Sequence, residues 1–167
     1  MKRGLRNNWW KFECFYPDGQ LKWVEVIPNI VVDEGIDHSL DVIFLGGTAY
    51  SSWYVALFNS DSTPAAGWVY ADIGTDQTEF TSYDETARPT WTPGSISNHT
   101  LSDQVSFTAS TGVSTTIYGS YVVNVSTKGD NASGVGIMWC ATRFSTPRPF
   151  IAAEVLNVTY SINSQDV

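Results

Sequence analysis

The chain has 167 residues, of which 43% are hydrophobic and only 16% are charged, and its net charge is −8. This length suits a single domain with a sizeable core. The negative charge argues against a nucleic-acid partner, because binding phosphates requires clustered cations. The sequence has no run of about 18 apolar residues, so we expect neither a membrane span nor a membrane partner.

The first residues differ in charge from the rest of the chain. Lys2, Arg3, Arg6 and Lys11 are four of the nine cations, whereas all 17 acidic residues follow Lys11. We therefore divide the chain into a basic N-terminal arm at residues 1–10 and a domain at residues 11–167. The arm has two open interpretations, a frayed terminus or a segment that docks on an acidic partner.

A hairpin and a helix are predicted next. Two runs of apolar and polar residues between Trp9 and Ile27 flank the turn sequence Pro17-Asp18-Gly19, which predicts a β-hairpin whose register stays open. Ile36, Leu40, Ile43 and Phe44 then recur at helical spacing. Acidic residues at the start and a Gly-Gly pair at the end predict a helix at about residues 33–45.

The segment from Trp53 to Phe58 has no polar interruption and is rich in aromatic and β-branched residues. Such a run is typical of a strand buried on both faces. We expect it to lie at the centre of the fold.

Residues 59–94 are rich in proline and glycine and contain scattered aromatic residues. Short strands are expected near residues 78–80 and 88–91. A segment this long is rarely without a role in a compact domain. Trp68, Tyr70 and Trp91 are therefore candidate contact residues. The alternative is that these aromatic side chains fold back as a lid over the core.

The second half of the chain has the alternation of β-strands at residues 104–110, 115–125, 135–144 and 154–162. Pro147-Arg148-Pro149 is expected to end the third of these strands. The predicted fold class is all-β, a β-sandwich or jelly-roll-like domain with one short helix. Cys14 and Cys140 lie in apolar strands, and we expect free, buried thiols.

The sequence shows no arrangement typical of an enzyme. His38 and His99 lie 61 positions apart, so we predict no catalytic residue, no metal and no cofactor. Two minority interpretations stay open. One is glycoside hydrolysis by a pair among the glutamates, which are Glu13, Glu25, Glu79, Glu85 and Glu154. The other is carbohydrate binding, with Trp68, Tyr70 and Trp91 as stacking platforms.

Several short segments together resemble a family of small virion structural proteins of tailed phages. The resemblance covers most of the chain after residue 11. The segments that carry it in the first half are Phe12-Glu13-Cys14, Asp18-Gly19, Leu21-Lys22-Trp23, Asn29-Ile30-Val31-Val32, Glu34-Gly35, Leu40-Asp41 and Trp53-Tyr54-Val55-Ala56-Leu57-Phe58. Those that continue it are Thr63-Pro64-Ala65-Ala66-Gly67, Arg88-Pro89-Thr90-Trp91, Ser126-Thr127-Lys128 and Leu156-Asn157-Val158-Thr159-Tyr160.

This resemblance implies a decoration or cement protein on the outer surface of the capsid, which binds and stabilises the shell of the major capsid protein. Such a protein is expected to form a homo-oligomer, a dimer or a trimer, about the symmetry axes of the shell. The candidate contact residues are Lys2, Arg3, Arg6, Trp9, Trp10, Trp68, Tyr70 and Trp91. The alternative is a tail-fibre or receptor-binding module that recognises host carbohydrates.

Overall fold

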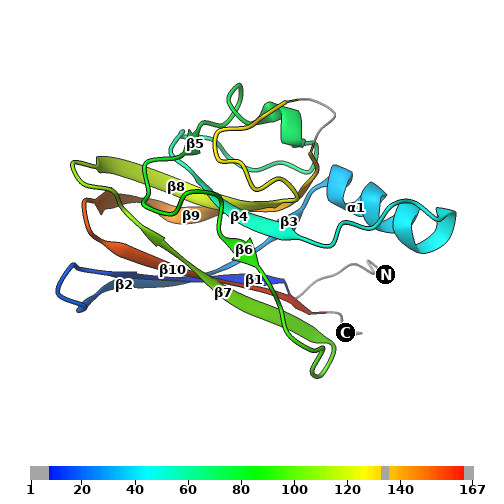
Figure 1. Cartoon of the computed structure of the whole chain (residues 1–167), viewed down its shortest axis with the longest axis horizontal. Coiled ribbons are helices and arrows are strands. Elements are labelled where there is room, and N and C mark those ends of the chain that lie inside the picture. The colour runs from blue at the N-terminus through cyan, green and yellow to red at the C-terminus, as the bar shows by residue number, and fades with distance from the viewer. Residues whose placement is uncertain (1–7, 133–135, 164–167) are drawn as a thin grey trace.

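The structure, a computed structural model, describes residues 8–132 and 136–163 and places two antiparallel sheets face to face (Figure 1). One sheet has the order β2 (Leu21–Pro28), β1 (Trp9–Phe15), β10 (Val155–Asn163) and β7 (Thr100–Thr108). The other has the order β3 (Ile30–Val31), β9 (Met138–Ile151), β8 (Ser114–Val123), β4 (Trp53–Phe58) and β5 (Glu79–Phe80), and β6 (Thr90–Trp91) also pairs with β4. The predicted all-β sandwich is confirmed.

The hairpin forms as predicted from β1 and β2. Gly19 has φ +84°, a backbone conformation that favours glycine, and its N–H donates to the carbonyl oxygen of Tyr16 at 2.9 Å. The ladder shifts register between Cys14 and Phe15, so a β-bulge sets the pairing that the sequence left open.

The folded domain begins earlier than residue 11. Trp9 and Trp10 are part of β1, and Trp10 is fully buried between the sheets. Asn8 is also held in place, because its carbonyl oxygen accepts from the N–H of Asn29 at 3.2 Å and its Oδ1 accepts from the N–H of Asn163 at 3.0 Å. The predicted boundary after residue 10 is therefore wrong, and the domain includes Asn8.

The prediction that β4 is buried on both faces is confirmed for its last four residues. Val55 and Leu57 belong to the core between the two sheets. Ala56 and Phe58 point to the opposite face and belong to a second buried cluster. Successive side chains of a strand alternate between its faces, so β4 contributes to both clusters.

The long segment after β4 covers this second face. It includes a single turn of 3₁₀ helix, η2 (Tyr70–Asp72), and its Trp68, Tyr70 and Ile73 pack in the same cluster as Phe58. Trp68 meets the ring of Phe58 edge-on at 5.9 Å between centroids. Of the two interpretations, the structure therefore adopts the second: Trp68 and Tyr70 fold back and this segment forms a lid over the core.

The predicted end of the third late strand is wrong, because β9 continues through Pro147 and Pro149 to Ile151. Its pairing with β8 moves from Gly119↔Arg143 to Ile117↔Arg148, which leaves Pro147 in an irregularity of the ladder. A bulge tolerates a residue without a backbone N–H, so the strand resumes after it.

Candidate functional site

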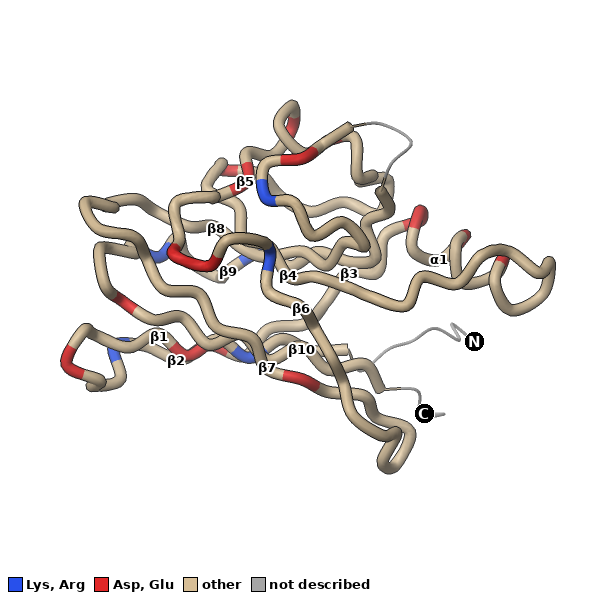
Figure 2. Tube along the Cα trace, viewed as in Figure 1, with Lys and Arg blue, Asp and Glu red and all other residues tan. Residues whose placement is uncertain are grey.

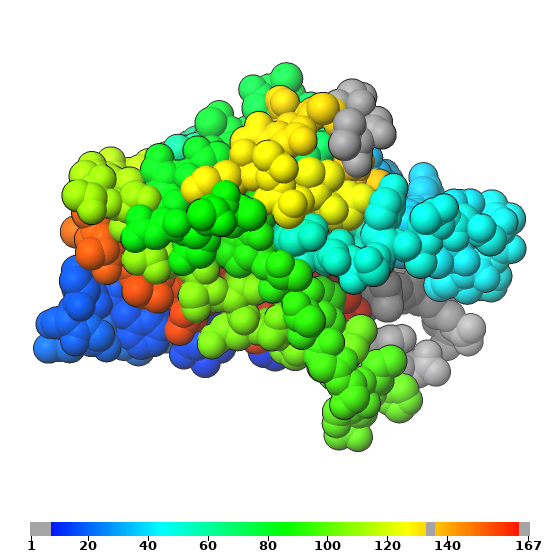
Figure 3. Space-filling model, viewed as in Figure 1, coloured from blue at the N-terminus to red at the C-terminus, as the bar shows by residue number. Residues whose placement is uncertain are grey.

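A helix projects from one end of the sandwich (Figures 1 and 3). It consists of α1 (Asp33–Leu40), continued by a π-helical turn, η1 (Asp41–Leu45). The predicted helix at residues 33–45 is confirmed. We call α1 and η1 together the projecting helix.

The projecting helix is anchored at its first turns. Glu34 accepts hydrogen bonds through Oε2 from the N–H of Tyr70 at 2.9 Å and of Met138 at 2.6 Å. Gly35 is buried, and a Cβ atom there would collide with the backbone of Trp139 in β9. Among the described residues, burial falls along the helix from these first turns onward.

The apolar side chains of the projecting helix are exposed, although their helical spacing is typical of a face that packs on a core. Ile36 and Leu40 are 42% and 49% exposed, and Ile43, Phe44 and Leu45 reach 68%, 73% and 80%. Exposed apolar side chains gathered in this way often mark an interaction site in a soluble protein.

The three most exposed of these side chains, Ile43, Phe44 and Leu45, belong to the π-helical turn. Such turns are rare and occur frequently at functional sites. Gly46 ends the turn with φ +77°, and its N–H donates to the carbonyl oxygen of Asp41. Ile43, Phe44 and Leu45 are consecutive, so one face of a helix could not bury all three.

A cleft of about 540 Å³ lies between the projecting helix and the end of the sandwich. His38 and Ser39 line it from the helix, and Trp53, Trp91 and Trp139 line it from the strands. Tyr50, which also lines the cleft, is 41% exposed. The cleft therefore has mainly aromatic and apolar walls with a few hydroxyl groups.

The rings of the cleft pack on one another. The centroid of His38 lies 5.0 Å from that of Tyr50 and 5.9 Å from that of Trp53, and Trp53 lies 6.0 Å from Trp139. The indole N–H of Trp139 donates to the hydroxyl of Tyr160 at 2.9 Å. These contacts hold the walls of the cleft in place.

His38 and Tyr50 are the titratable side chains among the described residues that line the cleft. Within the described part of the chain, no three His, Cys, Asp or Glu side chains come together as a metal site would require. The cleft suits the binding of an apolar or ring-shaped group. The described ranges also contain no helix with the length and apolar character needed to cross a membrane.

The structure buries four of the predicted contact residues. Trp10 is 0% exposed, and Trp68, Tyr70 and Trp91 are between 1% and 8% exposed. These side chains are not exposed contacts, because each fills a core cluster, although Trp91 also lines the cleft; their role in binding stays a prediction. Trp9 is 37% exposed on the outer face of β1, and its contact role stays a prediction.

Lys2, Arg3 and Arg6, the other predicted contact residues, lie outside the described residues. Figure 2 shows no cation on the projecting helix, which carries acidic residues instead.

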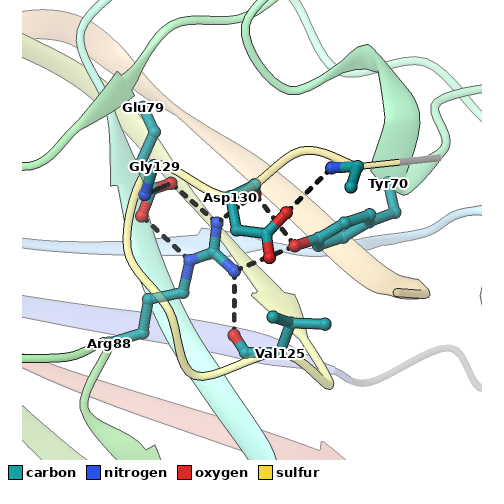
Figure 4. Close-up of polar contacts among 7 residues, drawn as sticks. Tyr70, Glu79, Arg88, Val125, Gly129 and Asp130 are labelled. Atoms are coloured by element: carbon teal, nitrogen blue, oxygen red, sulfur yellow. Dashed lines mark hydrogen bonds and ion pairs between the residues drawn. The ribbon is translucent and has the colours of Figure 1, made fainter. Parts of the chain in front are cut away.

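Tyr70 belongs to a buried polar network around Arg88 (Figure 4). Arg88 donates to Glu79 through Nε at 2.9 Å and Nη2 at 2.7 Å, and the carbonyl oxygens of Val125 and Asp130 each accept from it at 2.8 Å. The hydroxyl of Tyr70 donates to the same carbonyl of Asp130 at 2.8 Å. Burial alone would lower the pKa of Arg88, but Glu79 outweighs this effect and raises it. Arg88 therefore stays charged and ties the lid to the loop after β8.

Each glutamate considered for glycoside hydrolysis has a partner. The ion-pair partners are Lys11 for Glu13, Arg148 for Glu25, Arg88 for Glu79 and Lys22 for Glu154, and the backbone N–H of Thr108 donates to Glu85. None of these five carboxylates lines the cleft. Apart from the pair of Lys11 and Glu13, which lies within β1, these contacts link different strands and loops.

The sequence interpretation missed the apolar side chains at the end of the projecting helix and the Tyr50, Trp53 and Trp139 rings of the cleft. One signal was present, the consecutive apolar residues 43–45 directly before two glycines. No comparable local signal marks the cleft, because its walls come from several segments spread between His38 and Ile162.

No family model, curated protein or solved structure matches this chain.

Proposed function

We propose that this protein is a phage virion structural protein that decorates the outer surface of the capsid by binding the shell of the major capsid protein. The exposed apolar face of the projecting helix is the observation that carries this proposal. It places the two most exposed large apolar side chains of the described residues, Phe44 and Leu45, at one end of the domain. The resemblance described above supports the assignment to a virion.

The apolar face of the projecting helix consists of a few side chains, which suits a protein that attaches in many copies. A few exposed apolar side chains give weak binding alone, but a symmetric shell presents the same site many times. A dimer or trimer of this chain would raise the apparent affinity further, because its copies would bind neighbouring subunits together. Light scattering of the purified protein would measure this state.

The proposal is tested by retention on purified capsid shells. We expect Phe44→Ser to reduce the fraction that sediments with the shells, because it removes the largest exposed apolar side chain of the projecting helix. Val26→Ser is the matched control, since Val26 is 62% exposed on β2, away from the helix. Equal retention of both variants and the unaltered chain would rule out this surface.

The second candidate is a tail-fibre or receptor-binding module, which the aromatic cleft favours. Tyr50 and Trp53 could stack on a sugar ring, and Ser51, Ser52 and Thr92 line the same cleft with hydroxyl groups. We expect binding on a glycan array that Trp53→Ala abolishes. The absence of binding across the array would remove this candidate and leave the capsid proposal untouched.

A further inference from the structure

The projecting helix carries a stripe of acidic residues beside its apolar face. Asp33, Asp37 and Asp41 lie four residues apart, so they follow one line along the helix, and all three are exposed. None of them takes part in the ion pairs formed between described residues. A segment bound here would need both cations and apolar side chains.

The N-terminal segment of this chain has that composition. Residues 1–7 contain Lys2, Arg3 and Arg6 together with Met1 and Leu5, and no acid. Between Lys11 and the projecting helix, the sequence has one cation, Lys22. From the projecting helix to Arg88 it has none. The acidic stripe therefore has few counter-charges nearby in sequence, and residues 1–7 supply three.

The segment is also long enough. It joins the domain at Asn8, which is hydrogen-bonded to Asn29, four residues before the helix begins at Asp33. Seven extended residues span about 23 to 25 Å, and a helix of 13 residues is about 20 Å long. Lys2 and Arg6 would lie about 13 Å apart in an extended chain, close to the roughly 12 Å between Asp33 and Asp41.

We propose that residues 1–7 bind along the projecting helix of the same chain, with their cations on the acidic stripe and Leu5 on the apolar face. This contact covers the apolar face in the free protein. A partner that binds the face must first displace the segment, and salt weakens the contact by screening its charges. This contact within the chain is expected whichever partner binds the apolar face of the projecting helix.

Hydrogen exchange of the amides at residues 40–45 tests the contact, because this end of the helix is the most exposed part of it among the described residues. We compare the full chain with a chain that lacks residues 1–7 and with the variant Lys2→Glu, Arg3→Glu, Arg6→Glu. Both changes should speed exchange about threefold or more, the effect of three exposed ion pairs at the weak end of their usual range. High salt should speed exchange in the full chain only.

A charge swap makes the test specific. Adding Asp33→Lys, Asp37→Lys and Asp41→Lys to the charge-reversed segment should restore slow exchange, whereas adding Asp84→Lys should not, because Asp84 lies on the lid, beside β7 at Thr108. Equal exchange in the full and shortened chains would overturn the proposal. Protection that grows with protein concentration, together with a dimer in light scattering, would also overturn it, since the segment would then come from a second copy.

Discussion

Arg88 and Glu79 form a bidentate ion pair inside the domain, with side chains that are 0% and 3% exposed. Removing one partner leaves the other charge buried without compensation. We expect Arg88→Met to lower the free energy of unfolding by about 3 to 5 kcal/mol, measured by urea denaturation.

The exposed pair Arg143 and Asp61 provides the control for this prediction. Asp61 is 71% exposed, so solvent screens the pair, and Asp61→Asn, which keeps the hydrogen bond from Arg143 to the carbonyl oxygen of Ser62, should cost less than about 1 kcal/mol. Similar losses in both variants would contradict a structural role for the Arg88 network.

Gly35 provides the close contact that seats the projecting helix on β9. A Cβ atom at this position would collide with the backbone of Trp139, which cannot rotate away as a side chain could. We expect Gly35→Ala to cost about 1 to 3 kcal/mol of stability. Gly67→Ala is the control, because nothing lies within 4 Å of a Cβ atom there. An unchanged midpoint in both variants would show that the helix base moves freely.

The sequence predicted those elements that depend on local chemistry. The turn at Asp18-Gly19 needs a positive φ, the helix at residues 33–45 has acidic residues at its start and glycine at its end, and β4 is a continuous apolar run. Each of these features is determined within about ten residues. This locality explains why they could be read from the sequence alone.

The candidate site could not be predicted in the same way. Trp68 and Trp91 are buried because strands distant in sequence pass beneath and beside them, as the hydrogen bond from Trp91 to the carbonyl of Tyr160 shows. Conversely, Ile43 and Phe44 have the spacing of a buried face, but the helix extends past the sheet that would cover them. The sequence gives the size of each side chain, whereas the exposure of that side chain depends on its tertiary contacts.

Leu57 tests the central position of β4. Its side chain is fully buried between the sheets, so Leu57→Ala should leave a cavity and cost about 2 to 5 kcal/mol. Leu45→Ala is the control, because Leu45 is 80% exposed and its truncation should change stability by less than about 0.5 kcal/mol. A mild effect of Leu57→Ala in chemical denaturation would mean that the strand is not central.

The two thiols are predicted to be unreactive in the folded protein. Cys14 and Cys140 are free and buried, as the sequence predicted. Burial, aided by the nearby Glu154 carboxylate, raises the pKa of Cys14 to about 12, and burial also raises the pKa of Cys140. At pH 8 neither is a thiolate, which is the reactive form.

A colorimetric thiol reagent should therefore detect no fast reaction until denaturant is added, when both cysteines should react. Leu45→Cys supplies the positive control, because a thiol at that exposed position should react at once. A fast reaction of a native thiol without denaturant would contradict the burial of these strands.

Glu25 should make stability depend on pH in the acid range. Burial alone would raise its pKa, but the backbone N–H of Ser145 and the guanidinium of Arg148 donate to the carboxylate and lower the pKa below its ordinary value of 4.5. The folded state thus favours the ionised form. Its contribution is present above about pH 4.5 and is lost as the pH falls through the lowered pKa.

Glu25→Gln removes this charge and keeps the size of the side chain. At pH 7 we expect the variant to be less stable by about 1.5 to 3 kcal/mol, the usual contribution of hydrogen bonds to a charged group. Urea denaturation at pH 7 and at successively lower pH measures the difference, which should shrink as the pH falls through the lowered pKa and the unaltered glutamate becomes protonated. A difference that stays constant over this range would mean that the charge of Glu25 does not stabilise the contact between β2 and β9.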